Sequence, residues 1–272
     1  MSASNCYLFV ALPCEAKPLI EHFKLKKELS IHAFSIYRNA HLSLTVTGVG
    51  KSAMAAGVAY SLTLFPSPAL PVLLNIGIAG HRTQTLGSVL AADKIIDQDS
   101  ERNYYPQLVA TPPCATHTII TVSRPQMEYP GESLYEMEAA AFYETAIRFS
   151  SSELIQCIKI ISDNKSNPTE QIKAAQVSHW IQDALPIIEE YAQQLSQLAV
   201  LNKPLATSHF ADIIAQWHFS SHEQLQLKNL LNKRAILIPH QSLDLTGLSS
   251  GSGKRVLNYL RQEIDEHAFG GF

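Results

Sequence analysis

The sequence predicts an α/β fold with a mixed, largely parallel central sheet, followed by a small helical extension at the C-terminal end. Strand-length apolar runs alternate with helical segments over roughly the first 200 residues, which is typical of a parallel sheet covered by helices. Two early strand segments lie close together in the sequence, like a hairpin, and this favours a mixed sheet. Apolar residues form 46% of the 272-residue chain, which is enough for a sizeable core.

The individual elements follow from local patterns in chain order. Pro13 ends a short apolar run that has the length of a buried strand. Gly48 and Gly50 separate a later strand from a helix of small residues, and Pro66 and Pro71 close that helix. The expected strands are 6–12, 31–37, 42–47, 72–76, 89–96, 116–122 and 155–161. The expected helices are 15–23, 52–64, 138–149, about 170–198, 221–232 and 254–266.

The chain is expected to form two domains, 1–200 and 201–272. Asn202, Lys203 and Pro204 follow the long fourth helix and are typical of a boundary. The extension beyond them contains two amphipathic helices, separated by a loop rich in serine and glycine at 247–253. No internal repeat is evident, and the sequence assigns no role to the extension.

Composition excludes several classes of function. The formal net charge is −3 and only 17% of residues are charged, so no basic face for nucleic acid is expected. The four cysteines lack CxxC spacing, which favours reduced thiols and a cytoplasmic location. We expect no signal peptide and no membrane contact, because the sequence has neither a basic start before a long apolar stretch nor a run that could span a bilayer.

Acidic residues lie just after predicted strands or at the start of a predicted helix. Asp163 comes just after the buried strand 155–161, at the sheet edge where open α/β folds bind ligands. Glu138 opens a helix, whose free backbone N–H groups are expected to keep its carboxylate ionised. Glu15 follows the first strand. Carboxylates gathered at one edge of the sheet indicate a site for a small polyhydroxylated ligand.

Three other motifs are incomplete. A phosphate-binding loop ending in Lys51 and Ser52 would need glycine where Thr45 stands. Segment 247–251 fits the letters of a nucleophile elbow, but no clear strand precedes it. His218 and His222 have the spacing of helical zinc ligands, but no carboxylate or cysteine completes the set and a helix start is expected between them. We therefore expect no metal and no other cofactor.

Five short segments carry a resemblance to a known family. In their order and spacing the chain resembles the purine nucleoside phosphorylase/nucleosidase superfamily, particularly the methylthioadenosine/S-adenosylhomocysteine nucleosidases and their futalosine hydrolase relatives. The resemblance covers about residues 5–195 and implies the three-layer phosphorylase/hydrolase-like fold, cleavage of a nucleoside and, by analogy, a homodimer. The segments are 10–15, 47–51, 75–80, 135–139 and 161–163.

The resemblance also implies roles for particular residues. Glu15 would activate the attacking water, and Asp163 would protonate the leaving base. Met137 would pack against the sugar, and Glu138 would accept hydrogen bonds from its 2′ and 3′ hydroxyls. The remaining implied substrate-binding residues are Ile78, Ala79 and Gly80. This division agrees with the chemistry, since breaking an N-glycosidic bond develops positive charge on the sugar and negative charge on the departing base.

The sequence departs from the family pattern in three places. Ile78 stands where the nucleosidases usually carry serine, and Lys159 stands where they carry arginine. Lysine cannot make the bidentate contacts of arginine. The base-stacking segment, placed at 125–129, does not match clearly, and either Met127 or Tyr129 is a candidate to stack on the base. These departures bear on the substrate more than on the class of reaction.

Three functions therefore stand as hypotheses. The first is a nucleosidase that hydrolyses a purine or purine-like nucleoside to free base and sugar, with this small molecule as its partner. The second is a phosphorylase, to which Arg38 or Arg82 would contribute phosphate contacts, although the segment after the first strand lacks the aspartate and arginine typical of that branch. The third is a non-catalytic nucleoside-binding module.

Overall fold

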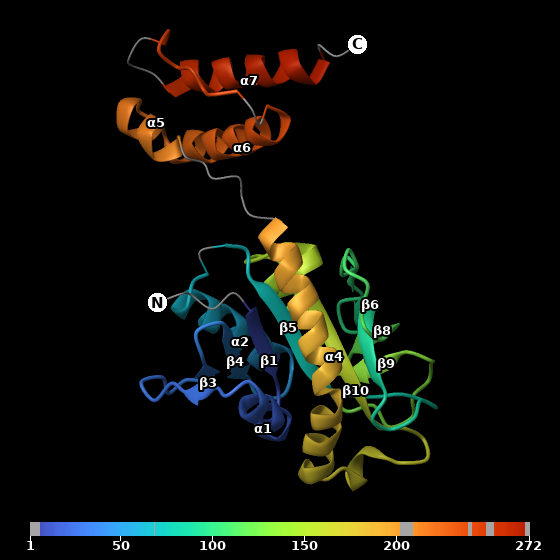
Figure 1. Ribbon diagram of the computed structural model, residues 1–272. Helices are drawn as coiled ribbons and strands as arrows, with labels where there is room; N and C mark the ends of the chain where they lie inside the picture. Colours follow the sequence, from blue (N-terminus) through green and yellow to red (C-terminus); the bar gives the residue numbers. More distant parts are fainter. Residues whose placement is uncertain (1–5, 68, 202–208, 239–240, 249–252, 270–272) are drawn as a thin grey trace. The chain divides into compact units, whose positions relative to one another are not determined.

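The computed structural model describes residues 6–67, 69–201, 209–238, 241–248 and 253–269. Contacts within the chain divide it into two compact units, Met1–Asn202 and Lys203–Phe272 (Figure 1). The first unit carries the sheet, and the described residues of the second form helices and the segments next to them.

The first unit is built on one mixed sheet centred on β5. Parallel pairing joins β5 to β1 on one side and to β10 on the other, and β1 pairs in parallel with β4. Pairings from β10 to β6, β8, β9 and back to β5 close that half of the sheet into a ring. The strands of the described chain are β1 Cys6–Val10, β2 Lys26–Lys27, β3 Ser35–Arg38, β4 Leu42–Val46, β5 Val72–Gly80, β6 Val89–Asp97, β7 Asn103–Tyr104, β8 Ala115–Thr121, β9 Leu134–Glu136 and β10 Ile155–Asp163.

Helices cover both faces of this sheet. One core cluster contains residues of α1 and α4, including Leu19 and Ile188, and the other contains residues of α2 and α3, including Val58 and Phe142. The predicted three-layer α/β fold with a mixed sheet is thus confirmed (Figure 1). The helices of this unit are α1 Pro13–His22, α2 Lys51–Leu64, α3 Ala139–Ala146 and α4 Ala174–Leu201, with 3₁₀ turns at η1 Ser152–Leu154 and η2 Thr169–Gln171.

The elements differ from the prediction mainly at their ends and in short pieces. Strand β5 continues through Gly80 and β10 through Asp163, so both strands run directly into the segments expected to bind a ligand. Helix α3 ends at Ala146, earlier than expected. Strands β2, β7 and β9 were not predicted, because two or three residues are too few to show a periodic pattern.

The second unit has its own apolar core, made by α5 Phe210–Gln216, α6 Ser221–Leu237 and α7 Gly253–Phe269. Ser220 caps α6 in a capping box with Glu223, so the predicted helix start between His218 and His222 is confirmed. Arg234 and Glu263 form an ion pair between α6 and α7. The elbow-like segment at 247–251 lies partly outside the described residues, as does the loop at 247–253.

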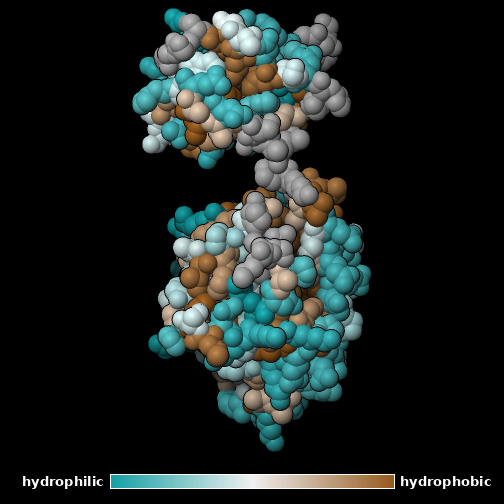
Figure 2. Space-filling model, turned by 60° about the vertical axis from the view of Figure 1, so that its left-hand side comes forward, coloured by the Kyte–Doolittle hydropathy of each residue, from teal (hydrophilic) through white to brown (hydrophobic). Residues whose placement is uncertain are grey.

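Hydrophilic and hydrophobic residues are mixed over the face of each unit shown in Figure 2. Among the helices of the described residues, none combines the length and apolar character needed to cross a membrane. The same part of the chain contains no group of three or more histidine, cysteine, aspartate or glutamate side chains placed to hold a metal ion.

Candidate active site

A pocket with a volume of about 160 Å³ lies where β1, β5, β9 and β10 end. This is the edge of the sheet at which the sequence placed a ligand site. The pocket brings together all the residues predicted to touch a substrate: Glu15, Ile78, Ala79, Gly80, Met137, Glu138 and Asp163. Further lining residues are Ala11, Leu12, Val49, Val122, Pro125, Gln126, Tyr135, Glu136, Ser162, Thr169 and Ile172.

Glu15 lies in the first turn of α1 and is 2% exposed. Its Oε2 accepts hydrogen bonds from the backbone N–H groups of Ala11 (3.0 Å) and Leu12 (2.8 Å), and its Oε1 accepts one from Ile78 (3.0 Å). Burial raises the pKa of the Glu15 carboxyl, while these hydrogen bonds and the Lys159 ammonium oppose the rise. The carboxylate is therefore held in one orientation by main-chain donors that follow β1 and by one within β5.

Glu136 and Lys159 form a buried ion pair beside Glu15. The Lys159 Nζ to Glu136 Oε2 distance is 2.8 Å, and each side chain is 1% exposed. Burial alone would lower the pKa of Lys159, but the carboxylates of Glu136 and Glu138 outweigh it, so the pKa is raised and the ammonium stays charged. A β-carbon on Gly77 would lie 3.0 Å from Glu15 Oε1 and 3.6 Å from Lys159 Nζ, which shows how closely the strand backbone approaches these groups.

Glu136, rather than Glu138, caps helix α3. Its Oε2 accepts hydrogen bonds from the backbone N–H groups of Glu138 (3.0 Å) and Ala139 (2.8 Å), and its Oε1 accepts one from the hydroxyl of Thr121 (2.6 Å). The Glu138 side chain makes no capping hydrogen bond. The prediction that the helix start keeps Glu138 ionised is therefore wrong: a neighbouring carboxylate already occupies the free N–H groups.

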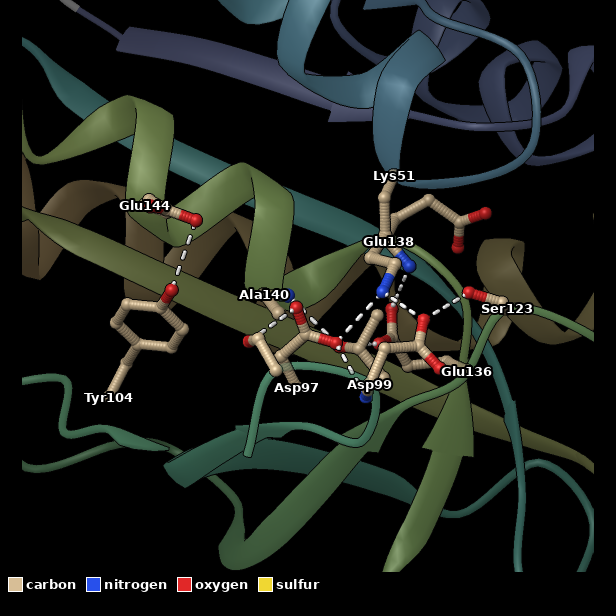
Figure 3. A network of polar contacts seen from close by, with 11 residues as sticks. Lys51, Asp97, Asp99, Tyr104, Ser123, Glu136, Glu138, Ala140 and Glu144 are labelled. Carbon is tan, nitrogen blue, oxygen red and sulfur yellow. Dashed lines mark hydrogen bonds and ion pairs between the residues drawn. The ribbon is translucent and has the colours of Figure 1, made fainter. Parts of the chain in front are cut away.

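Glu138 instead points toward the start of α2 (Figure 3), where its Oε1 accepts a hydrogen bond of 2.7 Å from the backbone N–H of Gly50. Burial and the nearby charge of Glu136 raise the pKa of Glu138 to about 7. Gly50 has a φ of 99°, a left-handed conformation that favours glycine, and this conformation accompanies the approach of its N–H to Glu138.

Lys51, the residue after Gly50, forms ion pairs with carboxylates at and just after the end of β6 (Figure 3). Its ammonium lies 2.8 Å from Asp97 Oδ1 and 2.5 Å from Asp99 Oδ2, and Asp99 accepts a further hydrogen bond from Ser123. The lysine that resembles a phosphate-binding residue in the sequence is thus paired with two carboxylates.

Asp163 occupies the other part of the pocket and is held differently. Its Oδ1 accepts a hydrogen bond from the Ser162 hydroxyl, and its Oδ2 accepts hydrogen bonds from the hydroxyls of Tyr129 and Thr169 (3.0 Å for Thr169). Burial raises the pKa of Tyr129 to about 12, so the phenol keeps its proton as a donor. A β-carbon on Gly80 would collide with Asp163 Oδ2 and with the Tyr129 ring.

The base-stacking candidates do not lie as the sequence suggested. Tyr129 is 2% exposed and contacts Asp163, and Met127 is 47% exposed; neither lines the pocket. Pro125 and Gln126 of the same segment do line it. Met137 lines the pocket and packs against the small cluster of Val122, Tyr129 and Tyr135.

Sequence patterns did not predict the roles of Glu136 and Tyr129, and they showed Lys159 only as a departure from a family pattern. A signal for the ion pair was present. Lys159 lies within an otherwise apolar buried strand, and a lysine in that setting requires a buried acidic partner. No comparable local signal pointed to Tyr129.

Sequence comparison finds no matching family model and no matching curated protein. Structure comparison finds solved proteins of the same fold. A 5′-methylthioadenosine/S-adenosylhomocysteine nucleosidase from S. pneumoniae, solved with a transition-state inhibitor, aligns with a TM-score of 0.57 and 16% identity over 70% of this chain and 99% of that one. The 5′-methylthioadenosine nucleosidase of Arabidopsis thaliana gives 0.56 and 14% over 73% and 97%.

A futalosine hydrolase mutant from Helicobacter pylori gives a TM-score of 0.56 and 11% identity, over 71% of this chain and 99% of that one. The fold implied by the resemblance is thus confirmed. At these identities the likeness concerns the fold, and the chemistry has to be argued from the pocket.

Proposed function

We propose that this protein is a nucleosidase that hydrolyses the N-glycosidic bond of a purine or purine-like nucleoside. The observation that carries the proposal is that Glu15, Glu138 and Asp163, from three separate parts of the chain, line one pocket at the edge of the sheet. Their surroundings give the pocket two chemically different ends, which match the two halves of a nucleoside.

The end that contains Glu15 and Glu138 suits the sugar. Positive charge that develops at the anomeric carbon is stabilised by nearby carboxylates. Glu15 takes the proton of the attacking water, and its raised pKa makes it a stronger base. Glu138 accepts hydrogen bonds from the sugar hydroxyls, and Met137 and Ile78 supply apolar contacts.

The end that contains Asp163 suits the departing base. As the bond between the sugar carbon and the base nitrogen breaks, its electrons move to the base, and a proton from Asp163 neutralises the charge there. The hydroxyl that water supplies ends on the sugar carbon, so the products are free base and free sugar. Ala79 and Gly80 line the pocket beside this acid.

The pocket favours water over phosphate as the second reactant. Among the described residues that line it there is neither lysine nor arginine, whereas phosphate binding requires a cluster of such donors. Lys159 lies behind the lining and is paired with Glu136, and Lys51 is paired with Asp97 and Asp99. Arg82 and Arg38, the earlier candidates, have acidic partners at Glu132 and Glu28.

The test is to incubate the full chain with a panel of purine nucleosides, including 5′-thio-substituted ones, with and without phosphate, and to measure free base. We expect release that does not depend on phosphate. Strict dependence on phosphate would instead identify a phosphorylase, and binding without release from any nucleoside would identify a binding module. The homodimer and the cytoplasmic location stay predictions.

A further inference from the structure

We infer that His81 is a positioning residue for Asp163, an inference that rests on the proposed function of the Asp163 end of the pocket. His81 follows Gly80 at the end of β5 and is 2% exposed, but it is not among the residues that line the pocket. It therefore acts on Asp163 from behind rather than on a substrate.

The His81 ring ties two separate segments together. Its Nε2 lies 2.7 Å from the carbonyl oxygen of Glu132, and its Nδ1 accepts hydrogen bonds from the backbone N–H groups of Thr83 and Gln84, both at 3.0 Å. A ring nitrogen that accepts two N–H groups carries no proton, so the ring proton is on Nε2 and is donated to Glu132. These three hydrogen bonds of the ring are thus satisfied in a single tautomer.

One arm of this arrangement reaches Asp163 through the main chain. The backbone N–H of His81 donates to the carbonyl oxygen of Asp163 at 3.0 Å. The turn whose N–H groups donate to His81 Nδ1 ends at Gln84. The carbonyl oxygen of Gln84 accepts a hydrogen bond of 2.9 Å from the Asn164 side chain. The carbonyl group of Asp163 and the side chain of the next residue, Asn164, are therefore both bonded to the turn that follows β5.

The other arm reaches the Asp163 carboxylate through Tyr129. Glu132, which the Nε2 atom holds, lies in the segment between Tyr129 and β9, and Tyr129 donates its hydroxyl proton to Asp163 Oδ2. Tyr129 has a φ of 47°, an uncommon backbone conformation for this residue type, so its place depends on neighbouring contacts. His81 is the residue that joins both arms.

Three substitutions separate the arms. In His81→Asn the side-chain oxygen can still accept from Thr83 and Gln84, but the bond to Glu132 is lost. In His81→Gln the longer amide can still donate to Glu132, but the acceptor for the turn is lost. His81→Ala removes both. The matched control is Glu132→Gln, which keeps the carbonyl oxygen that His81 uses and the length of a side chain that is 62% exposed. The Glu132 carboxylate lies 3.9 Å from His81 Nε2 and 3.3 Å from Arg82 Nη1, and exposed pairs of this kind contribute little.

With the nucleoside that the wild-type protein cleaves, we expect kcat to fall about tenfold in each of the two amide variants and roughly a hundredfold in His81→Ala, with KM changed less than about threefold. Glu132→Gln should match wild type. In a Tyr129→Phe background, the fall caused by His81→Asn should shrink, because the arm it breaks acts through the Tyr129 hydroxyl. A KM effect in place of a kcat effect, or full additivity with Tyr129→Phe, would overturn the inference.

Ligand-free measurements keep the inference testable if no nucleoside is cleaved. Amide hydrogen exchange at Thr83 and Gln84 should accelerate in His81→Gln and stay slow in His81→Asn. The NMR shift of the Asp163 carboxyl carbon should move in both variants and not in Glu132→Gln. Unchanged carboxyl shifts in both would show that His81 does not position Asp163, whatever the protein's activity.

Discussion

The two ends of the pocket hold their carboxylates by different kinds of donor. Glu15 and Glu138 accept from backbone N–H groups, those of Ala11, Leu12, Ile78 and Gly50. Asp163 accepts from side-chain hydroxyls. A backbone N–H only donates, whereas a hydroxyl both donates and accepts and can rotate. The hydroxyls around Asp163 can therefore reorient their hydrogen bonds, while the N–H groups around Glu15 and Glu138 can only donate.

The difference between the two ends of the pocket is tested most directly by replacing an acid with its amide at each end. Asp163→Asn should lower kcat by roughly 10²–10⁴ with little change in KM, because the amide keeps hydroxyl partners but cannot protonate the base. Glu138→Gln should mainly raise KM, because one of its polar atoms then donates where the sugar hydroxyls need an acceptor. Steady-state kinetics on both variants measures the split. Similar effects on kcat and KM in the two variants would remove the distinction between the ends.

The ion pair behind the Glu15 end should dominate stability. Lys159→Met leaves Glu136 buried without its partner and should lower the free energy of unfolding by about 3–5 kcal/mol. Adding Glu136→Gln should recover most of this loss, since the amide keeps an oxygen for the N–H groups of α3 and removes the charge. Urea unfolding of the single and double variants measures it. A double variant no more stable than Lys159→Met would contradict the electrostatic explanation.

The pH dependence of stability should come from Glu138. Its folded pKa of about 7 lies above the ordinary value of 4.5, so the folded state binds the proton more tightly than the unfolded state does. The resulting stabilisation is complete below pH 4.5 and is lost as pH rises through about 7, with a slope of at most about 1.4 kcal/mol per pH unit.

Thermal or urea unfolding between pH 5 and 8 measures this slope, and the Glu138→Gln variant should flatten it. In kinetics, kcat/KM should rise as Glu138 ionises, because only the carboxylate accepts from both sugar hydroxyls. An equally steep stability profile in the variant would assign the dependence to another group.

The ion pairs of Lys51 with Asp97 and Asp99 should contribute least to stability. Its side chain is 24% exposed and Asp99 is 55% exposed, so the surrounding water and salt weaken these pairs. Lys51→Met should cost less than about 1 kcal/mol, with a difference from wild type that shrinks in high salt. Activity should fall only a few-fold through the loop that presents Gly50 to Glu138. A loss of stability as large as that of Lys159→Met would mean that the exposed and the buried ion pairs contribute equally.

Much of the fold could be predicted because its strands and helices repeat local patterns. The apolar run that forms β10 and the small-residue helix α2 are examples. Parallel pairing then predicts that the carboxyl ends of the strands lie at one edge of the sheet. Strand β9 and helix α5 were missed since each is too short to show a period.

The site could be predicted as a set of acidic residues but not as a network. Glu136 and Lys159 are 23 positions apart by their numbers, and Tyr129 and Asp163 are 34 apart, so no local pattern connects either pair. Glu136 also took the helix start that Glu138 was expected to use. Glu136 is the last residue of β9, a strand too short to show a pattern, so the sequence did not reveal which of the two glutamates caps the helix.

The close approach of Gly80 to Asp163 and Tyr129 also limits how this sequence can change over time. Every replacement of Gly80 adds a carbon where the carboxylate and the ring already lie, so substitution at this position first requires a smaller residue at 129 or a displaced 163. The three positions are consequently bound to vary as a set. A homologous chain that has lost glycine there should therefore also carry a smaller residue at 129 or an acid moved away from its place at 163.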